Sequence, residues 1–170
     1  MPAEAPDLRS SGTRDEYVAD VVELIGSEPV ALIGQSLGGH TAFLVAARHP
    51  ELVERLVVIE ASPERDPNAP ETIRRFLAEN PAPYGTSVDP AEGAASVQEL
   101  SERDYWDEWD RLRCPTLVVR GERGHLPAEI AARMATTIEN GKAVEVTEAG
   151  HDVHLDRPAE LAEVLAAFLM

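Results

Sequence analysis

The sequence has little of what marks secreted or membrane-spanning proteins. It contains one cysteine in 170 residues, Cys114, so a disulfide within the chain is excluded and a buried thiol is expected. The first twelve residues hold neither a basic start nor an apolar segment, and no apolar run approaches the roughly 18 residues of a membrane span. We therefore expect a cytoplasmic protein with no membrane partner.

Basic residues are also few. The chain has 15 lysines and arginines against 31 acidic residues, which gives a formal net charge of −16 at pH 7. A charge of this sign repels phosphate backbones and anionic membranes, so we expect no nucleic-acid partner. The length of 170 residues is sufficient for one domain with a substantial core.

Residues 29–33 form a short apolar run without alternation, which is typical of a strand that is covered on both faces of a parallel sheet. Three further strands are expected at residues 55–62, 115–121 and 143–150. Helical periodicity lies between and around them, and the first helix follows a capping box formed by Thr13 and Glu16. The further helices are expected at residues 37–49, 70–79, 127–138 and 158–169. Alternating strands and helices predict an α/β fold, a parallel sheet with flanking helices.

The expected organisation is one domain with a tail. Residues 1–12 are predicted to be disordered and residues 13–170 to form a single domain. Residues 80–115 are rich in proline and show no clear pattern, so they are expected to be a cover over the functional site or a partly mobile loop. Within the domain we assign residues 64–112 to a reduced cap or cover segment.

Ser36 lies in the pattern G-x-S-x-G, between a predicted strand and a predicted helix. In that context the pattern indicates a nucleophile elbow, a strained turn that presents the serine hydroxyl above the sheet. Glycines are expected on both sides because neighbouring Cβ atoms would collide. The alternative is a glycine-rich turn with an inactive serine.

His151 follows the last predicted strand and should therefore stand at the same sheet edge as Ser36. Histidine can take the proton of a serine hydroxyl near neutral pH. The alternative is a histidine in a surface loop, which is also how His125 is interpreted. His154 could bind zinc together with His151, but no third ligand cluster accompanies them, so no metal is expected. Nucleotide-binding patterns are absent too, and we expect no cofactor.

The segments "GQSLGGHTA", "CPTLVVRGE" and "AGHDVHLDRPAEL" together resemble the α/β-hydrolase superfamily, in its serine hydrolase branch, over about residues 13–170. The resemblance implies that Ser36 is the nucleophile, His151 the general base, and the N–H of Leu37 one oxyanion-hole donor. It also implies a hydrolase of carboxylic esters or related small-molecule acyl substrates, which acts through a Ser-His-acid triad and an acyl-enzyme.

The chain departs from the family in the acid of the triad. The family usually has the acid at the position that Gly124 occupies here, and some members have it at the end of the preceding strand instead, where this chain has Glu60. We therefore expect Glu60 to orient His151. Glu122 is the second candidate, and a solvent-facing Glu60 is the alternative.

A second departure is that no segment before Ser36 resembles the family's N-terminal strands, one of which leads to the second oxyanion donor. The strand before Ser36 would then be a sheet edge with unpaired backbone groups, which proteins rarely leave open. We expect a shortened chain, a homodimer that covers this edge, or an N-terminal segment folded over it. The rival function is a truncated, non-catalytic α/β-hydrolase remnant that serves as a binding or interaction module.

Overall fold

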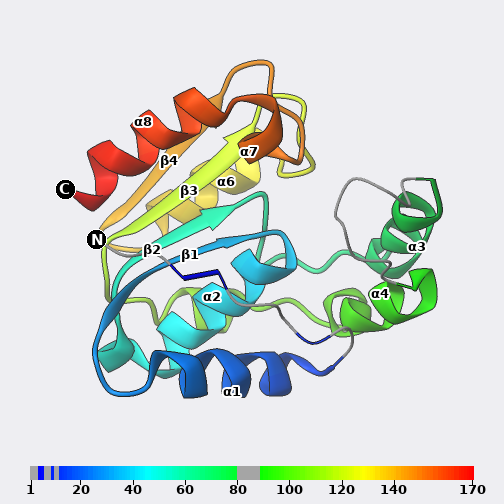
Figure 1. Cartoon of the computed structure of the whole chain (residues 1–170), viewed down its shortest axis with the longest axis horizontal. Helices are drawn as coiled ribbons and strands as arrows, with labels where there is room; N and C mark the ends of the chain where they lie inside the picture. The colour runs from blue at the N-terminus through cyan, green and yellow to red at the C-terminus, as the bar shows by residue number, and fades with distance from the viewer. Residues whose placement is uncertain (1–3, 6–8, 10–11, 80–88) are drawn as a thin grey trace. The chain divides into compact units, whose positions relative to one another are not determined.

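The computed structural model describes residues 4–5, 9, 12–79 and 89–170 (Figure 1). These residues belong to two compact units, one made of residues 1–23 with 64–104 and the other of residues 24–63 with 105–170. Most of the predicted N-terminal disorder, and residues 80–88 of the unpatterned stretch, lie outside the described residues. The assignment of a single domain with a cover segment stays a prediction.

The larger unit is built on a four-stranded parallel sheet with the order β1-β2-β3-β4. The strands are β1 (Val30–Gln35), β2 (Val53–Ile59), β3 (Thr116–Gly121) and β4 (Gly141–Val146). The predicted α/β class, a parallel sheet with flanking helices, is thereby confirmed. The strands predicted at 55–62 and 143–150 end earlier than expected, because the residues after Ile59 and Val146 leave the sheet and form loops at its carboxyl edge.

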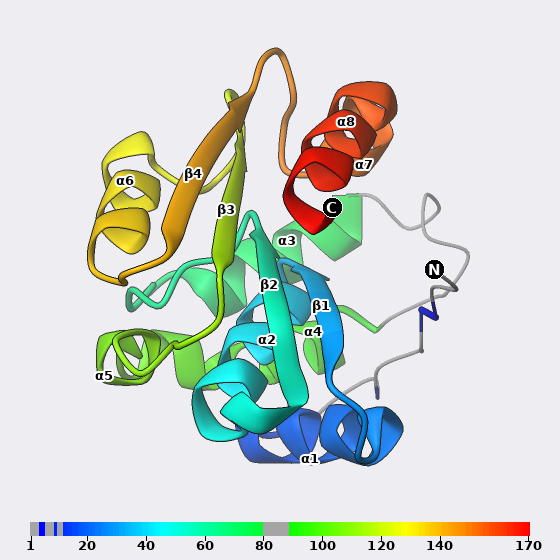
Figure 2. The ribbon, with the colours of Figure 1, turned by 90° about the vertical axis from the view of Figure 1, so that its left-hand side faces the viewer.

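Helices cover both faces of this sheet. They are α2 (Leu37–Arg48), η1 (Pro50–Leu52), α5 (Trp106–Trp109), α6 (Ala128–Thr136), α7 (Val153–Asp156) and α8 (Pro158–Leu169). In Figure 2, α8 lies on one side of the sheet and α6 on the other. The side chains of Phe43 and Trp109 stack edge to face, and the indole N–H of Trp109 donates to the carbonyl of Met134 at 2.9 Å. Helices α2, α5 and α6 are thus joined to one another on the face opposite α8.

The core beneath α8 follows from the β-branched and leucine residues of the strands, which fit a sheet covered on both faces. Its buried members are Val57, Ile59, Leu117, Val119, Val146, Ala149, Val153 and Leu161. Half-buried residues of α8, including Leu165 and Phe168, pack against this cluster. The cluster extends into the chain after β4, because Ala149 and Val153 belong to it. The loop that carries His151 is therefore held on both sides by buried apolar residues.

The smaller unit is helical. It contains α3 (Ala69–Glu79), α4 (Pro90–Ser96), η2 (Gln98–Ser101) and most of α1 (Arg14–Ile25). The capping box of α1 is confirmed: the N–H of Thr13 donates to Glu16 Oε2 at 2.8 Å, and the N–H of Glu16 donates to Thr13 Oγ1 at 3.2 Å. The hydrogen bond from the N–H of Thr13, together with one from the Thr13 hydroxyl, lowers the pKa of the Glu16 carboxyl.

The sequence failed to predict the helices of residues 89–115. This part of the stretch interpreted as a cover or loop contains α4, η2 and α5. They are short, at 7, 4 and 4 residues, so no helical period could develop in the sequence. Local capping defines α4 instead, since Asp89 accepts hydrogen bonds from the N–H groups of Ala91 and Glu92.

Strand β1 lies at the edge of the sheet, as the sequence predicts, and pairs only with β2 among the strands that the structure describes. Ile33, in the middle of β1, is 43% exposed. The homodimer expected from this edge stays a prediction.

Among the described residues, no helix is long and apolar enough to span a bilayer. Cys114 is half-buried rather than fully buried, and partial burial raises the pKa of its thiol.

Candidate active site

Ser36 lies where the elbow was expected, directly after β1 and at the N-cap of α2. Its backbone adopts φ 51° and ψ −120°, a combination that non-glycine residues rarely adopt. Two backbone hydrogen bonds hold the turn. The N–H of Ser36 donates to the carbonyl of Ile59 at 2.9 Å, and the N–H of His40 donates to the carbonyl of Ser36 at 2.9 Å. Strained residues that their surroundings hold in place concentrate at functional sites.

The two glycines around Ser36 are not equally necessary. A Cβ on Gly34 would overlap the backbone of Gly38 and would lie 2.7 Å from the nitrogen of Gly39. A Cβ on Gly38 would meet no atom of the described residues within 4 Å. The expectation that both flanking glycines avoid collisions is therefore wrong for Gly38. The second crowded position is Gly39, whose Cβ would lie 3.0 Å from that of Ala61.

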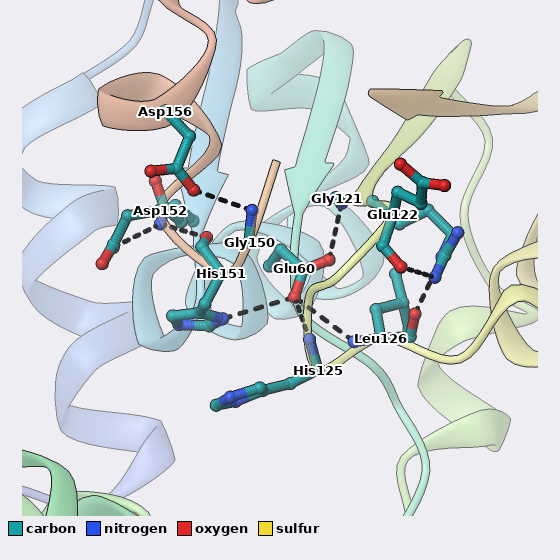
Figure 3. A network of polar contacts seen from close by, with 11 residues as sticks. Glu60, Gly121, Glu122, His125, Leu126, Gly150, His151, Asp152 and Asp156 are labelled. Carbon is teal, nitrogen blue, oxygen red and sulfur yellow. Dashed lines mark hydrogen bonds and ion pairs between the residues drawn. The ribbon is translucent and has the colours of Figure 1, made fainter. Parts of the chain in front are cut away.

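Glu60 follows the last residue of β2 and has a buried side chain. Its backbone is also in the left-handed region, with φ 50°. Three backbone N–H groups donate to its carboxylate (Figure 3): Gly121 to Oε1 at 2.8 Å, and His125 and Leu126 to Oε2 at 2.6 and 3.3 Å. A buried carboxylate needs such donors, because they replace the water that it loses.

Gly121 is the last residue of β3, whereas His125 and Leu126 lie in the loop after it, which Arg120 holds in place. The guanidinium of Arg120 donates to the carbonyl of Leu126 at 2.9 Å and to that of Glu122 at 3.1 Å, and it also pairs with Glu145 on β4. The loop thus holds its N–H groups toward Glu60.

Gly124, at the family's usual acid position, leaves room for the carboxylate of Glu60. A Cβ on Gly124 would overlap Cδ, Oε1 and Oε2 of Glu60. The backbone of Gly124 does not have a positive φ, so space rather than conformational freedom explains the glycine. A carboxylate thus stands beside position 124 although residue 124 has no side chain.

The structure brings Glu60 and His151 together. Nδ1 of His151 lies 3.4 Å from Oε2 of Glu60 (Figure 3). This distance is at the long end for a hydrogen bond. The side chain of His151 is 20% exposed. Glu122, the second acid candidate, is directed elsewhere: its carboxylate accepts from the N–H of Glu148 at 2.7 Å.

His151 reaches Glu60 by crossing the end of a strand. Ser36 follows β1 at one edge of the sheet, whereas His151 follows β4 at the other edge, about 14 Å away at the usual strand spacing. The chain after β4 therefore runs back over β3, where a Cβ on Gly121 would lie 2.6 Å from the carbonyl oxygen of Ala149. The N–H of Arg123 donates to that carbonyl at 2.8 Å and holds the crossing.

The crossing ends at β1. The side-chain amide of Gln35, the residue before Ser36, donates to the carbonyl of His151 at 2.9 Å and to Oδ1 of Asp152 at 3.2 Å. The histidine loop is thus bonded to the elbow strand itself. Sequence reasoning gave Gln35 no role.

His125 also lies against the site. It is exposed, as expected, but its ring stacks on that of His151, with centroids 4.8 Å apart and planes inclined by 22°. Figure 3 shows the two rings side by side below Glu60. Its position one residue after the usual acid position was the only signal in the sequence that could have found it.

Leu37, the expected oxyanion donor, is the first residue of α2. The first N–H groups of a helix have no intrahelical acceptor, so this group is suited to bind an anion. The described residues before β1 form α1 and no strand, and none of them was assigned as a second donor.

Within the described ranges, no group of three or more His, Cys, Asp or Glu side chains is placed to hold a metal ion.

Known proteins share the family and the fold of this chain. The model of the family described as "Alpha/beta hydrolase family" matches residues 3–164. The chain is similar to the serine hydrolase BPHL of Mus musculus, with 27% identity over 88% of this chain and 58% of the mouse protein. It is also similar to the esterase Rv0045c of Mycobacterium tuberculosis, with 23% identity over 97% of this chain and 67% of that esterase.

Among solved structures, the enol-lactonase from Burkholderia xenovorans LB400 has a TM-score of 0.79 at 19% identity, over 96% of this chain and 78% of that chain. A likeness at this identity supports the fold. The chain spans between 58% and 70% of the length of four curated relatives, each of which it matches over most of its own length.

Proposed function

The chain belongs to the alpha/beta hydrolase family, and we propose that it is a serine hydrolase of carboxylic esters or related acyl substrates. A hydrolase function agrees with the family and with the relatives, which include esterases and serine hydrolases. The proposal goes further in naming Ser36, His151 and Glu60 as the catalytic triad. A small-molecule substrate and a cytoplasmic location remain predictions from the sequence.

The reaction has two halves. In the first, Nε2 of His151 takes the hydroxyl proton of Ser36 while Oγ attacks the ester carbonyl, and the N–H of Leu37 binds the resulting oxyanion. The tetrahedral intermediate then collapses, and the alcohol leaves with the proton from His151. In the second half, His151 takes a proton from water, the hydroxide attacks the acyl group, and the acid leaves as Ser36 regains its proton.

The observation that carries the proposal is the contact between Glu60 and His151. The carboxylate lies at Nδ1, so Nδ1 donates and Nε2 keeps the lone pair that a base needs. A buried carboxylate also stabilises the imidazolium that forms when the proton moves. A histidine without this partner would lack both effects.

The relatives support an ester or another acyl substrate without naming one. The enol-lactonase and the mycobacterial esterase are named for reactions on lactones and esters. We propose the same class of carbonyl substrate for this chain. The competing hypothesis is a non-catalytic module, favoured by the lack of an assigned second oxyanion donor, since losing one such donor slows turnover by about 10² to 10³.

A fluorophosphonate probe separates the two hypotheses, because it forms a covalent bond only with an activated serine and needs no knowledge of the substrate. We expect a mass increase that corresponds to one adduct per chain. The same increase should be found in Ser101→Ala, and it should be absent in Ser36→Ala. Ser101 is the matched control, because its hydroxyl donates to the carbonyl of Gln98 within a short helix. An unlabelled but folded chain would leave the binding-module hypothesis in place.

A further inference from the structure

We propose that Gln35 is a positioning residue, whose side chain sets the placement of His151 relative to Ser36. The inference rests on the proposed function. The observation behind it is that one amide joins the strand of the elbow to the backbone of the histidine, across 116 residues of sequence.

The sheet order makes such a joint necessary. Ser36 follows β1 and His151 follows β4, at opposite edges of the sheet. The placement of His151 therefore depends on how far its loop extends back across the sheet. The carboxylate of Glu60 touches only the ring, at 3.4 Å, and a ring can turn about its own side-chain bonds. Gln35 instead bonds to the main-chain carbonyl of His151. Since Ser36 is the next residue after Gln35, this bond fixes the backbone of one reacting residue to that of the other.

The chemistry of the amide matches its two partners. The NH₂ group of glutamine offers two hydrogens, and both partners are acceptor oxygens, the carbonyl of His151 and Oδ1 of Asp152. The orientation of the amide follows from these partners, because its oxygen in the same place would face two other oxygens. A leucine would fill the space without donating, and a glutamate would place a carboxylate against that of Asp152.

The bonded segment continues into ordered structure. Asp152 is the N-cap of α7, and its carbonyl accepts from the N–H groups of Leu155 at 2.8 Å and Asp156 at 3.0 Å. The carboxylate of Asp156 in turn accepts from the N–H of Gly150 at 2.7 Å. Releasing the Gln35 amide should therefore loosen the turn on both sides of His151, and hydrogen exchange of these N–H groups can detect it.

The test compares Gln35→Leu with the intact chain by two readouts: the rate of fluorophosphonate labelling and hydrogen–deuterium exchange of residues 150–157. We expect labelling to slow by about 10- to 100-fold, the effect of misplacing a reacting group by roughly 1 Å. We expect faster exchange in residues 150–157 with little change in the melting temperature. Gln98→Leu is the matched control, since its amide donates to Ser101 and Glu102 within four residues. It should change neither readout.

A rescue pair distinguishes positioning from general damage. Gln35→Glu should slow labelling at least as much as Gln35→Leu, because two carboxylates then face each other. Adding Asp152→Asn gives the new carboxylate an N–H donor, so the double variant should label faster than Gln35→Glu alone.

The outcomes separate this inference from the proposed function. Normal labelling and normal exchange in Gln35→Leu would overturn the role of Gln35 and leave the triad intact. If the unsubstituted chain is never labelled, but residues 150–157 exchange faster after Gln35→Leu, the proposed function is overturned. The hydrogen bond of Gln35 would still hold the histidine loop in that case.

Discussion

The carboxylate of Glu60 occupies the space that a side chain on residue 124 would need. The two positions are therefore mutually exclusive, since one accommodates a carboxylate only while the other has no side chain. They lie on different loops, after β2 and after β3, and the carboxylate of Glu60 is the one that lies at Nδ1 of His151. This relationship explains why Gly124 stands at the family's usual acid position.

We predict that the acid can be moved between these positions. Glu60→Gly removes the carboxylate and places a glycine where φ is 50°, and it should slow labelling of Ser36 by about 10⁴-fold, the loss seen when a triad acid is neutralised. Adding Gly124→Asp supplies a carboxylate in the vacated space, so the double variant should recover part of the rate. Gly124→Asp alone should be impaired, because two carboxylates would compete for one place. A double variant no faster than Glu60→Gly would contradict the exchange.

The choice between the two acid candidates has a direct test. Glu60→Gln keeps the shape of the side chain but cannot stabilise an imidazolium, so the labelling rate should fall by about 10⁴-fold. Glu122→Gln should change the rate less than twofold, because its carboxylate bonds to the N–H of Glu148 rather than to His151. Rates measured by intact mass over time would decide, and equal losses in both variants would refute the assignment of Glu60.

The ring of His125 should support that of His151. His125→Ala removes the stacked ring but keeps the N–H that donates to Glu60, so we expect labelling to slow by up to about tenfold, the range of an aromatic pair. His125→Phe keeps a flat ring and should retain most of the rate. If phenylalanine is no better than alanine, stacking is not what the ring contributes.

The glycines of the elbow should differ in their tolerance of a methyl group. Gly34→Ala forces a Cβ into the backbone of Gly38, so the melting temperature should fall sharply or the chain should fail to fold. Gly38→Ala meets open space within α2, so the free energy of unfolding should stay the same or rise by up to about 1 kcal/mol. Thermal denaturation checks both, and a large loss in Gly38→Ala would show that its space is not open.

The predicted homodimer can be tested at the edge of the sheet. If a second copy pairs with β1, sedimentation velocity should show a dimer that dissociates on dilution. Ile33→Lys should prevent it, because a lysine on an edge strand opposes pairing. Met170→Lys, which also replaces an exposed apolar residue, is the control and should leave the dimer unchanged. A monomer at every concentration of the unmodified chain would refute the dimer.

The sequence predicted the parts of the structure that depend on local pattern. Short runs rich in apolar residues located the strands, and the glycines of the elbow located Ser36 between a strand and a helix. His151 could be proposed because parallel strands bring their carboxyl ends to one edge. Glu60 could be proposed because the resemblance to the α/β-hydrolase superfamily allows the acid at the strand end where Glu60 lies. Their roles in catalysis stay predictions, although the structure does bring the two side chains together.

The remaining features depend on contacts that no local pattern encodes. The amide of Gln35 meets residues 116 and 117 positions away, and a strand-end glutamine has no signature of such a bond. Gly121 permits the crossing of a loop that the sequence could not route. Among the short helices of residues 89–115, α4 is defined by its Asp89 cap and α5 by the packing of Trp109, rather than by periodicity.

The long reach of the histidine loop also bears on how the chain folds. The Glu60 to His151 contact spans 91 residues, and the Gln35 bond spans 116, so both are among the last to form as the polypeptide is synthesised. A ribosome-bound chain can complete β1, the elbow and α2 well before His151 has been translated. In the proposed mechanism its Ser36 would still lack a base, so the nucleophile becomes reactive only once the sheet is complete.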